Sequence, residues 1–178
     1  MTQAYHPPIP TRWPKAFVDD IGGRVAEQLG VTPGADLSSL VESMGGQIVY
    51  GPQYSDEYEG GAIVVRAFDD FTITLSNLTS GKRDRFTIAH ELGHLALHYQ
   101  PVLEAHGKVI MRATRDKTSL DADHERCEWE ANWFAAGFLM PRDKFAEAAK
   151  KYTNASLATY FNVSGAAIDV RKKTLGIP

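Results

Sequence analysis

The pentapeptide His90–His94 carries the clearest chemistry in this sequence. It reads His-Glu-Leu-Gly-His, so two histidines lie four positions apart and a glutamate directly follows the first. On an α-helix, positions i and i+4 lie one above the other, about 6 Å apart along the axis, and two imidazoles at that spacing can bind one metal ion. Glu91 is poorly placed to join them as a ligand, but it can reach a water on the metal. The pattern predicts a metallohydrolase in which His90 and His94 bind zinc and Glu91 is the general base.

The alternative is a chance match, because the motif fixes only three positions. The helix predicted over residues 84–98 argues against chance, since it is apolar on nearly every side and is therefore expected to be buried. Its apolar residues are Phe86, Ile88, Ala89, Leu92, Leu95, Ala96 and Leu97. Burying two histidines and a glutamate that have no purpose is energetically costly, so the surroundings favour a metal site.

A third protein ligand is required, and His98 is the nearest candidate in the sequence. It lies eight residues after His90, which is about 12 Å along a straight helix and too far for one ion to bridge. In the metzincin arrangement a glycine turn returns a third histidine, but here Leu97 occupies the glycine position and Gln100 the ligand position. We therefore expect His98 to support the site from outside or to pack in the core.

A second predicted helix, residues 121–139, supplies two glutamates on different faces. Glu128 shares its face with small residues such as Ala131, which would let this helix pack close to the first one. Glu130 lies about 200° away in line with aromatic residues. We predict Glu128 as the third ligand and Asn132, one turn further on, as a hydrogen-bond partner for a histidine, with Glu130 as the alternative ligand.

Other arrangements stay open at this point. His106 and His124 lie in or near a segment expected to be irregular, and either could supply the third ligand. Both glutamates could instead be exposed salt-bridge partners of residues such as Arg126.

The single cysteine, Cys127, is expected to pack in the core, the alternative being a thiolate that binds and blocks the metal. Imidazole and carboxylate ligands suit zinc, although manganese or iron could occupy the same site.

The first half of the chain must supply the scaffold. Prolines at positions 7, 8, 10 and 14 predict an extended arm, and apolar spacing predicts a helix from Phe17 to about Gly30, then a short one over residues 36–42. Three runs of β-branched and aromatic residues, separated by turn signals, predict a small antiparallel sheet. These runs are residues 47–50, 61–66 and 71–76. Together with the two long helices they indicate an α+β fold.

The second half is predicted to be mainly helical. Residues 99 to about 120 are expected to be irregular, with one candidate strand at 108–112. Near the end, two short helices meet at residues 162–164 in a helix-turn-helix-like arrangement, with Ser164 as the N-cap of the second. That helix begins with glycine and alanines, whereas side chains that read DNA usually come from the helix start. We therefore expect this segment to pack on the domain or to dock a substrate.

Composition restricts the class of protein. The 178 residues fit one domain, the net charge of −3 gives no general attraction to nucleic acid, and no run of residues is apolar enough to span a membrane. From Pro141 onward the chain carries seven basic and three acidic residues, so the body is acidic and the C-terminal segment is basic. A single cysteine and a start without a secretory signal pattern favour a reducing cytoplasm.

Two motifs read together resemble the ImmA/IrrE family of zinc metallopeptidases. They are residues 85–94, RFTIAHELGH, and residues 128–141, with the pattern ExxANxFAAxxLMP. The resemblance implies a zincin-like helical core of the gluzincin type, with His90, His94 and Glu128 on zinc and Glu91 as general base. It also implies a substrate, because members of this family typically cleave a helix-turn-helix transcriptional repressor and so derepress phage, mobile-element or stress genes.

These expectations define three segments and a function. The segments are an extended arm (1–16), a zincin-like metallopeptidase domain (17–140) and a helix-turn-helix-like C-terminal segment packed on it (141–178). The expected function is that of a cytoplasmic zinc endopeptidase that cleaves a specific repressor protein and does not bind DNA directly. The alternatives are an anti-repressor that binds without cleaving, its metal site structural or inert, and a DNA-associated regulator acting through the basic tail.

Overall fold

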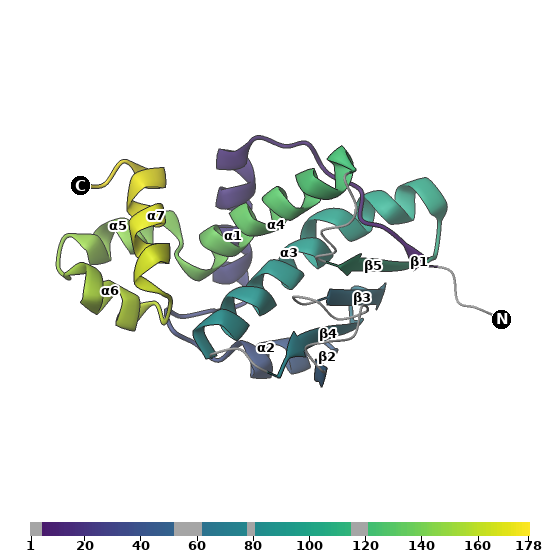
Figure 1. The fold of residues 1–178 in the computed structure, drawn as a ribbon, viewed down its shortest axis with the longest axis horizontal. Helices are drawn as coiled ribbons and strands as arrows, with labels where there is room; N and C mark the ends of the chain where they lie inside the picture. Colours follow the sequence, from purple (N-terminus) through teal and green to yellow (C-terminus); the bar gives the residue numbers. More distant parts are fainter. Residues whose placement is uncertain (1–4, 52–61, 78–80, 115–120) are drawn as a thin grey trace.

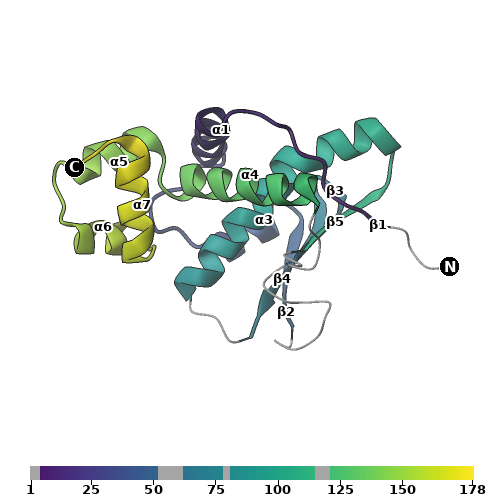
Figure 2. The ribbon, with the colours of Figure 1, turned by 45° about the horizontal axis from the view of Figure 1, so that its top comes forward.

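A long helical layer lies over one side of a small sheet in the computed structural model (Figures 1 and 2), which describes residues 5–51, 62–77, 81–114 and 121–178. The α+β class predicted from the sequence is confirmed. In chain order the elements are β1 (Tyr5–His6), α1 (Lys15–Gln28), α2 (Leu37–Ser43), β2 (Gly46–Gly51), β3 (Ala62–Ala67), β4 (Asp70–Ser76), α3 (Gly81–His106), β5 (Ile110–Thr114), α4 (Ala122–Leu139), α5 (Arg142–Ala149), α6 (Asn154–Tyr160) and α7 (Gly165–Leu175).

The sheet has the strand order β1-β5-β3-β4-β2. A tight turn joins β3 to β4, and these strands pair antiparallel, as do β3 and β5. The pairs β2–β4 and β1–β5 are parallel, so the prediction of an antiparallel sheet is wrong in this respect. That prediction took strands adjacent in the sequence to be adjacent in space, whereas β2 lies beside β4 and the arm contributes β1. Gly61, predicted to start a strand, lies outside the described residues.

Helix α3 packs on the sheet and carries the predicted metal motif. It contacts β3, β4 and β5, and alternate sheet residues are buried beneath it. The most deeply buried of these are Ile63, Val65, Phe71, Ile73, Leu75, Met111 and Ala113. The sheet covers the motif of α3 on one side and α4 covers it on another. The motif is therefore shielded from bulk water, as the apolar composition of the helix indicates.

Helix α3 is longer than predicted. It continues through Pro101 to His106, so the expectation of an irregular segment from residue 99 is wrong as far as residue 106. A proline inside a helix costs about 3 kcal/mol because it removes a hydrogen bond. Burial of Tyr99 and Val102 on either side offsets that cost, and the Tyr99 hydroxyl donates a 2.8 Å hydrogen bond to the carbonyl of Arg66. The predicted strand at 108–112 is β5 at 110–114, and residues 115–120 lie outside the described part.

Glycines allow α1, α3 and α4 to approach one another closely. A Cβ atom on Gly137 of α4 would lie 1.9 Å from the carbonyl oxygen of Asp19 in α1, which no real structure tolerates. A Cβ on Gly93 of α3 would lie 3.1 Å from the Cα of Ala131 in α4. The prediction that small residues let α4 pack close to the motif helix is confirmed, and it is this approach that brings side chains of α4 to His90 and His94.

Helices α5–α7 form a unit at the end of the molecule away from the sheet (Figures 1 and 2). Ser164 accepts a hydrogen bond from the backbone of Ala167 and caps α7, as predicted. Arg171 of α7 is 1% exposed, forms an ion pair with Asp19 of α1 and donates a 2.9 Å hydrogen bond to the carbonyl of Met140. Among the described helices, none is long and apolar enough to cross a membrane.

Candidate metal centre

The histidine pair of α3 converges as the helical spacing requires. The Nε2 atoms of His90 and His94 lie 3.1 Å apart, and both side chains are 1% exposed. Each ring is held at its other nitrogen, because His90 Nδ1 lies 2.9 Å from Asn132 Oδ1 and His94 Nδ1 lies 3.0 Å from His98 Nδ1. The predicted contact of Asn132 with a histidine is present. Both rings therefore turn their Nε2 atoms toward one point.

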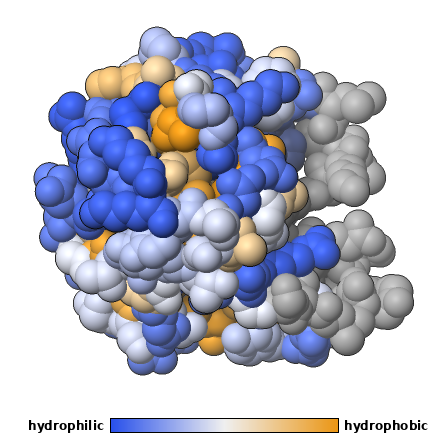
Figure 3. Space-filling view, turned by 90° about the vertical axis from the view of Figure 1, so that its left-hand side faces the viewer, coloured by the Kyte–Doolittle hydropathy of each residue, from blue (hydrophilic) through white to orange (hydrophobic). Residues whose placement is uncertain are grey.

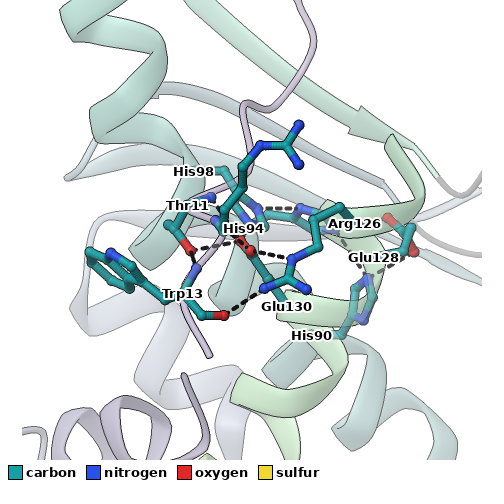
Figure 4. A network of polar contacts seen from close by, with 9 residues as sticks. Thr11, Trp13, His90, His94, His98, Arg126, Glu128 and Glu130 are labelled. Carbon is teal, nitrogen blue, oxygen red and sulfur yellow. Dashed lines mark hydrogen bonds and ion pairs between the residues drawn. The ribbon is translucent and has the colours of Figure 1, made fainter. Parts of the chain in front are cut away.

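Glu128 of α4 completes a group of three. Its carboxylate oxygens lie 3.3 Å from His90 Nε2 and 3.1 Å from His94 Nε2, and its side chain is 20% exposed (Figure 4). Burial raises the pKa of Glu128, but hydrogen bonds and charge from the two histidines outweigh this and hold the pKa well below its ordinary value. The carboxylate is therefore ionised, the form in which it can bind a cation.

The three donors fit a divalent cation. Among the described residues they form one group of histidine, cysteine or acidic ligands that could hold a metal ion. A tetrahedral site with metal–ligand bonds of about 2.0–2.1 Å places its ligand atoms about 3.3 Å apart. The two Nε2 atoms, 3.1 Å apart, are close to that spacing, and each lies 3.1–3.3 Å from a different oxygen of Glu128. Taken with one ligand atom per residue, the three donors lie within 4.8 Å of one another. Two neutral imidazoles with one carboxylate form a donor set suited to zinc.

Comparison with known proteins gives the family. The IrrE N-terminal-like domain of the Peptidase_M78 family matches residues 66–173, more than half of the chain and the part that holds α3 and α4. The chain belongs to this family. The resemblance noted from the two motifs is thereby confirmed. Among curated proteins, none matches the sequence.

The IrrE-type fold is also found in a solved structure. A Mycobacterium tuberculosis transcriptional regulator superposes on 92% of this chain with a TM-score of 0.63 and 23% sequence identity. At that identity the likeness concerns the fold. The chain spans 48% of the length of that regulator.

A second acid on α4 lies on the other side of the histidines in this IrrE-type domain. Glu130 is completely buried and lies 3.0 Å from Nε2 of His98, which is itself completely buried (Figure 4). The interpretation of both glutamates as exposed salt-bridge partners is therefore wrong. His98 is not part of the group of three, and its Nδ1 lies 3.0 Å from Nδ1 of His94.

The N-terminal arm closes over this second acid. Glu130 accepts hydrogen bonds from the backbone N–H and hydroxyl of Thr11, both at 2.9 Å, and from the backbone N–H of Arg12 at 2.8 Å. Arg126 donates to Glu130 at 2.8 Å and to the carbonyl of Trp13 at 2.6 Å, so it binds the acid and the arm together. Sequence reasoning missed these contacts, because no local pattern connects residues almost 120 positions apart.

The electrostatics of the second side are consistent with a neutral histidine and an ionised acid. Burial lowers the pKa of His98 from 6.5 to about 4, although its hydrogen bond to Glu130 acts in the opposite direction. Burial raises the pKa of Glu130, but hydrogen bonds from His98 and Arg126 outweigh it and hold the pKa at about 2. At neutral pH the His98 ring therefore carries one proton, on one of its two nitrogens.

The remaining candidate ligands lie outside the group. His106 lies at the end of α3 and packs against His6 of β1, with the ring centroids 4.4 Å apart and the rings tilted by 32°, and His124 lies in the first turn of α4. Cys127 is completely buried, and burial raises the pKa of its thiol, which disfavours the thiolate that metal binding requires. Glu91 is also buried, at 1% exposure, directly beside His90 on α3.

Proposed function

We propose that this chain is a zinc-dependent endopeptidase of narrow specificity, with His90, His94 and Glu128 as metal ligands. The observation that carries the proposal is the convergence of these three donors, within 4.8 Å of one another, in a member of a peptidase family. When bound, the cation supplies Lewis acidity that polarises a carbonyl oxygen and makes water easier to deprotonate. Manganese and iron are the alternative metals.

Glu91 is proposed as the general base. It takes a proton from the attacking water as the new carbon–oxygen bond forms, and it returns that proton to the amine nitrogen as the peptide bond breaks. Asn132 keeps the His90 ring oriented by accepting from Nδ1.

A helix-turn-helix transcriptional repressor is the proposed substrate. The support is the family's association with regulation and the structural likeness to a transcriptional regulator. We assign residues 141–178 a packing and docking role, since Arg171 is buried in an ion pair with Asp19 and is unavailable to DNA phosphates. The face formed by this segment is largely hydrophilic, with small hydrophobic areas between the polar side chains (Figure 3).

The test is the substitution Glu91→Gln in protein whose metal content has been measured. The wild-type chain and the variant are incubated with repressors encoded beside its gene, and the products are weighed by mass spectrometry. We expect the variant to cleave about 10²–10⁴-fold more slowly while it keeps its metal. Glu125→Gln, an exposed position on α4, is the matched control and should cleave normally. A repressor that binds the wild-type chain and stays intact would instead identify an anti-repressor.

A further inference from the structure

A continuous path of polar contacts leads from the N-terminal arm, here residues Tyr5–Pro14, to a proposed metal ligand. It runs from Thr11 to Glu130, then to His98, and ends at Nδ1 of His94 (Figure 4). The four groups come from the arm, α4 and α3, and the two inner ones are completely buried. At the other proposed histidine ligand, Nδ1 of His90 lies 2.9 Å from the amide oxygen of Asn132.

The path has a single consistent direction of donation. A metal bound at Nε2 of His94 uses the lone pair there, so the ring proton lies on Nδ1 and is donated to Nδ1 of His98. His98 then carries its own proton on Nε2 and donates it to Glu130. The path ends at the carboxylate of Glu130, which only accepts hydrogen bonds. Each contact along the path therefore pairs one donor with one acceptor.

We propose that Glu130 and His98 are positioning residues, through which the arm fixes the ring of His94 toward the metal. The outer partner of a metal-bound histidine normally sets its tautomer and orientation, and its loss weakens metal binding. Here that partner is a second histidine, with the acid one step further out.

The arm is needed to hold Glu130 in place, because it supplies most of the hydrogen-bond donors around that carboxylate. Glu130 accepts five hydrogen bonds, and three of them come from the arm, through Thr11 and the backbone of Arg12. These contacts hold the carboxylate at a fixed place beside His98. A residue almost 120 positions away thereby becomes part of the metal centre without touching the metal.

The inference rests on metal binding by the proposed triad and is tested by affinity for Zn²⁺, measured against a chromophoric chelator in metal-stripped protein. We expect Glu130→Gln and His98→Phe to bind Zn²⁺ about 10–100-fold more weakly than the wild-type chain. Thr11→Val, which removes one hydroxyl donor, should lose less of the Zn²⁺ affinity. Glu125→Gln should bind Zn²⁺ as the wild-type chain does. With Co²⁺ in place of zinc, the visible absorption bands should change in His98→Phe and stay unchanged in Glu125→Gln.

A double variant distinguishes positioning from general stabilisation. If the arm acts through His98, Thr11→Val should weaken Zn²⁺ binding in the wild-type background and add nothing in the His98→Phe background. Circular dichroism and thermal unfolding of the metal-free proteins establish that each variant is folded. If Glu130→Gln does not fold, the Thr11 and His98 variants still decide the question.

The outcomes separate this inference from the proposed function. Failure of the wild-type chain to bind Zn²⁺ would overturn the metal centre itself. Tight binding by the wild-type chain with undiminished binding by folded His98→Phe or Thr11→Val would overturn only the positioning role. A Thr11→Val loss that persists in the His98→Phe background would show that the arm does not act through His98.

Discussion

Helix α4 presents two glutamates, two residues apart, to the two sides of one row of histidines, and their surroundings differ. Glu128 faces the Nε2 atoms of His90 and His94 and keeps a side chain that is 20% exposed. Glu130 faces His98, is completely buried and accepts five hydrogen bonds. Part of the Glu128 side chain is accessible, whereas the carboxylate of Glu130 has its acceptor capacity filled by described residues of the protein. We therefore propose that the same residue type serves as a metal ligand on one side and as a positioning residue on the other.

The largest expected difference between the two sides concerns metal affinity. Glu128→Ala removes a proposed ligand, so it should weaken Zn²⁺ binding by far more than the roughly 100-fold upper range for loss of an outer partner. Chelator competition measures this directly. Binding close to that of the wild-type chain would mean that Glu128 is not a ligand and would remove the distinction between the two acids.

The free energy of unfolding should show the reverse order, with the larger loss in the Glu130 variant and the smaller one in the Glu128 variant. Glu130→Ala leaves Arg126, His98 and three donors of the arm without their acceptor, so the free energy of unfolding of the metal-free protein should fall by about 3–5 kcal/mol. Glu128→Ala should change it by about 1 kcal/mol or less. Urea unfolding of both metal-free variants provides the comparison, and equal losses would contradict it.

The positions of Glu128 and Glu130 both depend on the position of α4, and the contact of α4 with α1 fixes that position. Gly137→Ala puts a methyl group against the backbone of Asp19, so we expect a loss of about 1–3 kcal/mol in unfolding free energy. Gly165→Ala is the control, because no atom lies within 4 Å of the added carbon and alanine favours a helix. If the two variants were equally stable, the close approach of α1 and α4 would be in doubt.

The smallest effect is expected at Cys127, which lies between the two sides. Its thiol is completely buried and burial raises its pKa, so a thiol reagent at pH 8 should not label the folded protein. Labelling should become complete when denaturant is added. Fast labelling of the folded chain would revive the idea of a cysteine that competes for the metal.

The sequence was sufficient for the parts of this site that depend on local geometry. The convergence of His90 and His94 follows from helical spacing, and the contact of Asn132 with His90 follows from its position one turn after Glu128. The role of Glu91 as general base stays a prediction. The choice of Glu128 over Glu130 rested on the small residues beside it, and the close approach of Gly93 to Ala131 explains how α4 brings Glu128 to the two histidines. Its role as a metal ligand stays a prediction.

The side of Glu130 depends on contacts between distant segments, and these were not predictable from one sequence. The partners of Glu130 lie in the arm, and no periodicity connects them to α4. The parallel pairing of β1 with β5 and β2 with β4 has the same origin, because the register of distant strands is a property of the whole sheet. The expectation of an irregular segment from residue 99 also failed at this level, since burial of Tyr99 and Val102 beside Pro101 offsets the hydrogen bond that the proline removes from α3.

The most direct test of the central claim is an anomalous difference map, recorded at the zinc absorption edge from crystals grown with zinc. The account predicts one peak within bonding distance of His90 Nε2, His94 Nε2 and the Glu128 carboxylate. A peak on other residues, or none at this triad, would contradict it.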